Sequence, residues 1–148
     1  MSRSSLALFL LTLFGSSNVV ASVHAGLAWV NEIDGAPSAA MTLSWETDDA
    51  HPWEVMGGVI RSRHDAHLRT PRVLFGSASK RFTWNGWFVQ GGIAATSSDT
   101  DVLSAHWQFA TGAGYRQGRF TVSLRHLSNA STSGDNRGET LMLFQYGF

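Results

Sequence analysis

The 148-residue chain contains no cysteine, so a disulfide framework cannot stabilise it. Basic and acidic residues are balanced at 11 each, which leaves no strongly cationic surface of the kind that nucleic acids bind. No stretch has the long amphipathic periodicity of a helix, and no internal repeat, charge block or low-complexity linker divides the chain. These absences exclude a disulfide-rich scaffold and a nucleic-acid-binding protein, and they favour one domain.

The N-terminal segment differs from the rest of the chain. Arg3 supplies an early positive charge, the run from Leu6 to Phe14 is apolar, and small residues stand at Ala21 and Ala25. This order is typical of a secretory signal peptide, and the apolar run is too short for a membrane-spanning helix. We expect residues 1–25 to be removed, by cleavage after Ala25 or after Ala21, and residues 26–148 to form a single mature domain.

Short runs that alternate between apolar and polar residues recur along the mature chain, as is typical of strands. The clearest is Ala40 to Glu46, in which Met41, Leu43 and Trp45 share one face. Together with the two runs of a C-terminal hairpin, the alternating runs predict eight strands. Pro71 counts against one uninterrupted strand in its own run. The other expected strands are Leu27 to Ile33, Trp53 to Ile60, Arg69 to Gly76, Trp87 to Thr96 and Leu103 to Gly112.

The faces of these strands distinguish a soluble sandwich from a membrane barrel. A membrane barrel turns its large apolar residues outward and keeps polar residues inside. The export signal, the many aromatic residues and a C-terminal Phe148 favour this second arrangement. We therefore predict an all-β fold, an eight-stranded antiparallel outer-membrane β-barrel with a side-chain-filled interior. The six tryptophans are expected in girdles at the two membrane interfaces.

The residue types used in hydrolysis are concentrated between Phe120 and Phe148. Alternation places Val122, Leu124, His126 and Ser128 on one face of a strand. Side chains at positions i and i+2 are close enough for an imidazole to approach a serine oxygen, so a base and a nucleophile share an apolar face. The Gly-x-Ser-x-Gly elbow of many serine esterases is absent, and a hydrolase hypothesis therefore rests on this pair.

This stretch resembles the outer-membrane lipid A 3-O-deacylase family, also called PagL. Its mark is a His-x-Ser-Asn-Ala segment followed by Asn-x-Gly and an acidic residue, which correspond to His126, Ser128, Asn129, Asn136 and Glu139. The resemblance implies a serine esterase that removes an ester-linked 3-hydroxyacyl chain from lipid A in the outer leaflet. It implies catalytic roles for His126, Ser128 and Glu139, and oxyanion support from Asn129 and Asn136.

The third catalytic position is left open by the spacing. Relatives usually have one residue between the glycine and the acid, whereas Glu139 follows Gly138 directly, so strict spacing assigns the position to Thr140. Counting back from Phe148 in steps of two also turns Thr140 outward and Glu139 inward, unless a bulge resets the register. The glycine that often follows the alanine of the motif is Ser131 here.

The alternative function is a non-catalytic eight-stranded outer-membrane protein with a structural or adhesive role, which explains every feature except the clustering in the last hairpin. We expect no cofactor and no metal, and we interpret the segment from His64 to His67 as a polar turn. The expected partners are lipid A and outer-membrane lipid, with no nucleic acid. A homodimer and the acyl-chain preference are left open.

Overall fold

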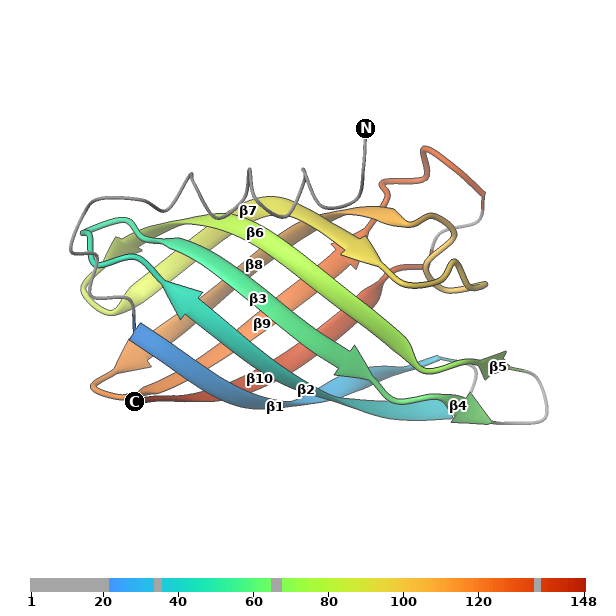
Figure 1. Cartoon of the computed structure of the whole chain (residues 1–148), viewed down its shortest axis with the longest axis horizontal. Coiled ribbons are helices and arrows are strands. Elements are labelled where there is room, and N and C mark those ends of the chain that lie inside the picture. Colours follow the sequence, from blue (N-terminus) through green and yellow to red (C-terminus); the bar gives the residue numbers. More distant parts are fainter. Residues whose placement is uncertain (1–21, 34–35, 65–67, 135–136) are drawn as a thin grey trace, which may run out of the picture.

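The computed structural model describes residues 22–33, 36–64, 68–134 and 137–148. Eight strands close into an antiparallel barrel in the order β1-β10-β9-β8-β7-β6-β3-β2, and β4 and β5 form a small separate hairpin (Figure 1). The strands are β1 (Ser22–Ile33), β2 (Ala36–Glu46), β3 (Trp53–Ile60), β4 (Arg63–His64), β5 (Arg69–Thr70), β6 (Val73–Trp84), β7 (Trp87–Thr96), β8 (Trp107–Gln117), β9 (Phe120–Ser128) and β10 (Glu139–Gly147). The eight-stranded all-β prediction is confirmed.

Among the described residues, no helix has the length and apolar character needed to cross a membrane.

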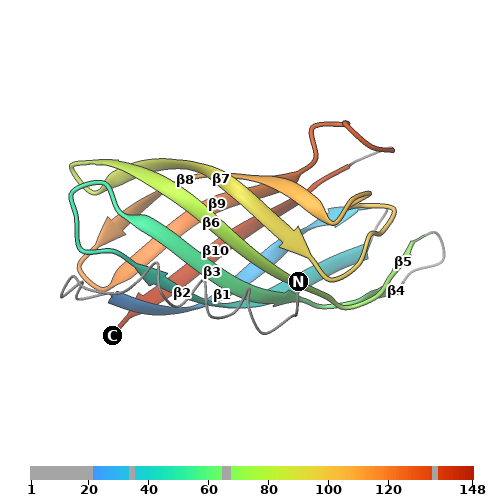
Figure 2. The same ribbon diagram turned by 45° about the horizontal axis from the view of Figure 1, so that its top comes forward.

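The two ends of the barrel differ (Figures 1 and 2). The start of β1 and the C-terminus lie at one end, where the connections after β2, β6 and β8 are short; we call this the turn end. The connections after β3, β7 and β9 are longer and lie at the opposite end, which we call the loop end. Short turns at one end and longer loops at the other are typical of outer-membrane barrels, whose loops face the cell exterior.

The outer surface of the barrel carries the apolar residues of the alternating pattern. All six tryptophans point outward, with exposed fractions between 44% and 68%. Trp29 and Trp107 lie toward the loop end, and the other four lie near the turn end, at Trp45, Trp53, Trp84 and Trp87. This placement near the two ends agrees with the predicted girdles, because an indole ring that contacts both lipid and water is stable at a membrane interface.

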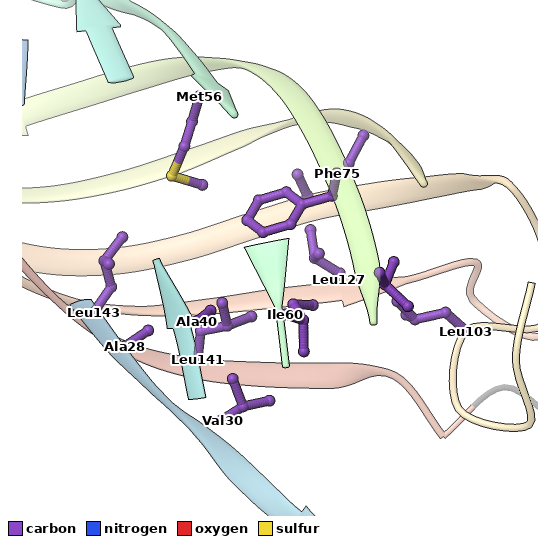
Figure 3. Packing of buried hydrophobic residues seen from close by; sticks show 13 residues of the cluster. Ala28, Val30, Ala40, Met56, Ile60, Phe75, Leu103, Leu127, Leu141 and Leu143 are labelled. Carbon is purple, nitrogen blue, oxygen red and sulfur yellow. The ribbon is translucent and has the colours of Figure 1, made fainter. Parts of the chain in front are cut away.

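The interior of the barrel is filled by side chains of two kinds. Toward the turn end, Arg81 pairs with Glu46 at 2.6 Å and with Glu54 at 3.2 Å, and Arg125 pairs with Glu54 at 2.7 Å. Each of these charges is buried, and pairing is required because an unpaired buried charge costs several kcal/mol. The half toward the loop end is apolar (Figure 3). It contains Val30, Ile60, Phe75, Leu103, Leu141 and Leu143.

Two expected strands are displaced along the chain. The run from Arg69 to Gly76 is divided at Pro71, so β5 ends before it and the barrel strand β6 begins at Val73. Proline lacks the N–H that a central strand needs. The strand expected from Leu103 to Gly112 instead runs from Trp107 to Gln117, beyond the small residues Gly112, Ala113 and Gly114 at which the expected run stopped.

The first strand begins earlier than the predicted domain boundary. β1 includes residues 22–25, with His24 opposite Gly147 of β10 and opposite Ser44 of β2. The predicted cleavage after Ala25 would remove this paired segment, whereas cleavage after Ala21 would keep it. The signal peptide itself stays a prediction.

Candidate active site

The candidate site lies on the outer surface of the barrel at the loop end, where β9 ends and β10 begins. His126 and Ser128 lie two residues apart on the outward face of β9 and are both partly exposed. Val122 and Leu124 precede them on this face and are largely exposed. The alternation therefore places His126 and Ser128 on the outward, apolar surface of the barrel, as expected from the sequence.

Thr140 holds the imidazole of His126. The two residues are directly opposite in the β9–β10 register, and His126 Nδ1 lies 3.0 Å from Thr140 Oγ1. The ring lies against Gly138, where an added Cβ would be 2.7 Å from His126 Cε1 and 2.9 Å from Nε2. Because Glu139 is opposite Leu127, continuing the register by one residue sets Gly138 level with Ser128. The Nε2 edge of the ring therefore extends toward the level of Ser128.

Glu139 lies inside the barrel. It is 3% exposed, and its two carboxylate oxygens accept hydrogen bonds from Arg63 Nη1 at 2.5 Å and Nη2 at 2.8 Å. The register of β10 against β9 is continuous from Glu139 to Tyr146, so no bulge turns Glu139 outward. The expected contact with His126 is thus made by Thr140, as the count from Phe148 indicated. The carboxylate of Glu139 bonds Arg63 and not the imidazole of His126. Its catalytic role stays a prediction.

The turn after Ser128 has an unusual backbone. Ala130 and Ser131 both have positive φ, 54° and 58°, a left-handed conformation that L residues seldom adopt. This turn directs the N–H of Ala130 at Ser128 Oγ, with a distance of 3.1 Å between the two atoms. The turn therefore brings a backbone donor beside the Ser128 hydroxyl.

Asn129 is engaged in holding the loop. It is buried, and its Nδ2 donates to Ser104 Oγ at 3.1 Å and to Ser133 O at 2.7 Å. Its Oδ1 accepts from the N–H of Ser131 at 2.9 Å. Both amide N–H groups have acceptors within the protein, so the predicted oxyanion role would require the amide to exchange a partner. Asn136, the second predicted support residue, lies outside the described residues.

The connection after β7 supports the site from the side, which the sequence pattern did not indicate. Val102 is fully buried, and its carbonyl accepts from the N–H of Gly138 at 3.0 Å. Thr100 Oγ1 accepts from the N–H groups of Val102 and Leu103, and so orders this loop. In the sequence, Asp99 and Asp101 indicated only a solvated loop in this connection. Both aspartates are exposed, as expected.

Within residues 22–33, 36–64, 68–134 and 137–148, no group of three or more His, Cys, Asp or Glu residues could hold a metal ion. The segment predicted to be a polar turn, His64 to His67, lies largely outside the described residues.

Comparisons with known proteins agree with the barrel fold. The crystal structure described as that of the outer membrane enzyme PagL has the same fold, with a TM-score of 0.53 and 20% sequence identity over 86% of this chain and 98% of that chain. Comparison with curated proteins gives no match. The family model described as lipid A 3-O-deacylase (PagL) matches residues 20–148, which include every strand of the barrel and the whole candidate site. The chain therefore belongs to the lipid A 3-O-deacylase (PagL) family of outer-membrane β-barrel enzymes.

Proposed function

We propose that the barrel acts as a serine esterase, in which Ser128 is the nucleophile and His126 the general base for removal of the ester-linked 3-hydroxyacyl chain of lipid A. One observation carries this assignment. Thr140 holds Nδ1 of His126, while the Nε2 edge of the ring lies against Gly138, level with Ser128. A base whose one nitrogen is fixed and whose other nitrogen extends toward a serine is the arrangement that nucleophilic catalysis requires.

The reaction proceeds in two halves. Ser128 Oγ attacks the ester carbonyl carbon as His126 Nε2 takes its proton, and the N–H of Ala130 stabilises the oxyanion. The ester C–O bond then breaks, and His126 returns the proton to the departing sugar oxygen. Water attacks the acyl-enzyme with His126 again as base, which releases the 3-hydroxy fatty acid and restores Ser128.

The position of the site suits a lipid substrate. Phe109 lies opposite Ser128 in the β8–β9 register, and Leu124 pairs with Met142 just below the site. All three side chains are exposed on the lipid-facing surface and offer apolar contacts to an acyl chain. The loop end faces the cell exterior, so these residues reach the outer leaflet, where acyl esters lie just beneath the headgroup of lipid A.

The other predicted residues support the site indirectly. Thr140 Oγ1 accepts the Nδ1–H of His126 and selects the tautomer in which Nε2 is free to take a proton. Asn129 fixes the turn that carries the N–H of Ala130, and Glu139 fixes the start of β10. Asn136 is assigned oxyanion support by the family motif alone.

Activity is tested on protein refolded in detergent, with lipid A as substrate and mass spectrometry of the released fatty acid. Ser128→Ala and His126→Ala should each lower the rate by about 10⁴-fold or more, because nucleophile and base act as a unit. The control is Ser97→Ala, which removes an exposed serine of the β7–β8 connection at the same end of the barrel. Heat-modifiable gel migration verifies that each variant is folded.

Two outcomes would contradict the proposal. Full activity in folded Ser128→Ala would remove the serine mechanism. Lipid A of unchanged mass after prolonged incubation with folded wild-type protein would instead favour the non-catalytic structural role. Chelators of calcium and zinc should leave the reaction intact, since the proposed steps use protein groups and water alone.

A further inference from the structure

Arg63 enters the mouth of the barrel from outside the strand wall. It belongs to the short β4 hairpin in the connection between β3 and β6, yet its side chain has no exposed area. Its guanidinium donates to both oxygens of Glu139 on β10, at 2.5 and 2.8 Å. It also donates to the carbonyl of Ala36 on β2 at 3.1 Å and to that of Asn31 on β1 at 3.0 Å. One side chain thereby joins four elements of the loop end.

The surroundings make this ion pair unusual. The other buried arginines, Arg81 and Arg125, share their carboxylates in the network toward the turn end. The Arg63–Glu139 pair instead stands beside buried apolar residues of the loop end, among them Val102 and Leu141. Transferring a charge pair into such surroundings costs desolvation energy that an apolar pair would avoid, so stability alone is a poor explanation for it.

The pair is linked directly to the residues that hold the catalytic base. Glu139 stands between Gly138, against which the His126 ring lies, and Thr140, which bonds its Nδ1. Asn31 accepts from Arg63 through its carbonyl and from the N–H of Thr140 through Oδ1, at 2.8 Å. Arg63 therefore fixes both the residue before Thr140 and the residue that bonds the Thr140 backbone.

We propose that Arg63 is a positioning residue for ester hydrolysis, which acts through Glu139 and Asn31 to hold Thr140 and Gly138 against the imidazole of His126. This inference rests on the proposed function of His126. Arg63 lies inside the barrel mouth and does not touch the lipid-facing surface, so it affects the geometry of the base and leaves the binding of lipid unchanged.

The test compares kcat and KM for lipid A in refolded wild type, Arg63→Gln and Arg63→Lys. Loss of the Arg63 contacts with Glu139 and Asn31 should lower kcat by about 10²-fold in Arg63→Gln, because a displacement of the His126 ring by about 1 Å is enough for such a loss. KM should stay within about twofold, because uniform substrate binding is unaffected. Arg63→Lys should recover only part of kcat, because an ammonium cannot reproduce the bidentate contact with Glu139.

Arg81→Gln is the matched control, because it breaks equally buried ion pairs at the opposite end of the barrel. It should lower the resistance to urea unfolding while kcat stays at the wild-type value. The losses of kcat in Arg63→Gln and Glu139→Gln should not add in the double variant, because each substitution breaks the same ion pair.

The outcomes separate the two proposals. Wild-type kcat in folded Arg63→Gln, or a change confined to KM, would overturn the positioning role while leaving the serine mechanism intact. Inactive wild-type protein that is demonstrably folded would overturn the proposed function itself. If Arg63→Gln does not fold, Arg63→Lys and Glu139→Gln decide: a selective loss of kcat in both supports positioning, and unchanged kcat in both rejects it.

Discussion

His126 Nδ1 lies 3.0 Å from a hydroxyl, Thr140 Oγ1, at the position where the spacing of the family motif assigns an acid. A threonine hydroxyl orients the ring through this contact, but unlike a carboxylate it carries no negative charge. The neighbouring carboxylate, Glu139, is turned inward and bound to Arg63. Under the proposed mechanism, the imidazolium of His126 would therefore be well oriented but would lack a negative partner in Thr140.

Replacing Thr140 should change the rate in both directions. Thr140→Glu supplies the missing charge and should raise kcat by about tenfold, whereas Thr140→Val removes the acceptor and should lower it by about tenfold. Thr140→Ser keeps the hydroxyl and serves as the control, with kcat near that of wild type. Initial rates of fatty acid release measure all three. Equal rates in the Val and wild-type proteins would show that this hydrogen bond has no part in catalysis.

Gly138→Ala should damage the site more than the fold. The substitution introduces a Cβ 2.7 Å from His126 Cε1 and puts alanine at a φ of 71°. The backbone cost is about 1–2 kcal/mol, and displacement of the ring should lower kcat by about 10²-fold.

The matched control is Gly118→Ala in the β8–β9 turn, where φ is 58° and an added Cβ meets nothing within 4 Å. Urea unfolding should show greater destabilisation in Gly138→Ala, because its Cβ would also be 2.9 Å from the carbonyl oxygen of Leu127, and fatty acid release should fall in that variant alone. Comparable activity in both would mean that contact with the His126 ring is unimportant.

Ser131→Gly should stabilise the barrel. Ser131 has a φ of 58°, a conformation that costs an L residue about 1 kcal/mol or more and that glycine adopts freely. The N–H that bonds Asn129 Oδ1 is kept, so activity should be maintained. Ser133 lies in the same loop and has no positive φ, so the control Ser133→Gly should not stabilise the barrel. Unfolding midpoints in urea measure the difference, and a lower midpoint for Ser131→Gly would contradict the strain argument.

The mature protein should begin at Ser22, by the second of the two predicted cleavages. His24 is buried opposite Gly147, and the N–H of Phe148 donates to the carbonyl of Val23 at 2.9 Å. Cleavage after Ala25 would remove the β1 residues that pair with this end of β10 and expose its backbone groups on that side, which is costly in lipid. Intact-mass measurement on outer-membrane fractions decides between the two sites, and a chain that begins at Gly26 would reject this prediction.

The sequence determined the features that depend on alternation along a strand. Period two in β9 is enough to place His126 and Ser128 together on the outer surface, because successive side chains of a strand point to opposite faces. The same parity, counted from Phe148, gave the orientation of Glu139 and Thr140. It misplaced the bounds of β6 and β8, where Pro71 interrupts the first run and small residues such as Gly76, Ala78, Ala113 and Gly114 interrupt the large apolar residues of the strands.

Only the tertiary structure decided which residues surround this pair. Arg63 is 76 positions from Glu139, and Val102 reaches Gly138 from a separate loop, so neither contact has a local sequence pattern. The left-handed turn at Ala130 and Ser131 also departs from the usual residue preferences, and Asn129 ties it to a separate loop through Ser104, 25 positions away. Local periodicity fixes the face of a side chain, whereas its partners depend on the closure of the barrel and the packing of loops that are distant in the chain.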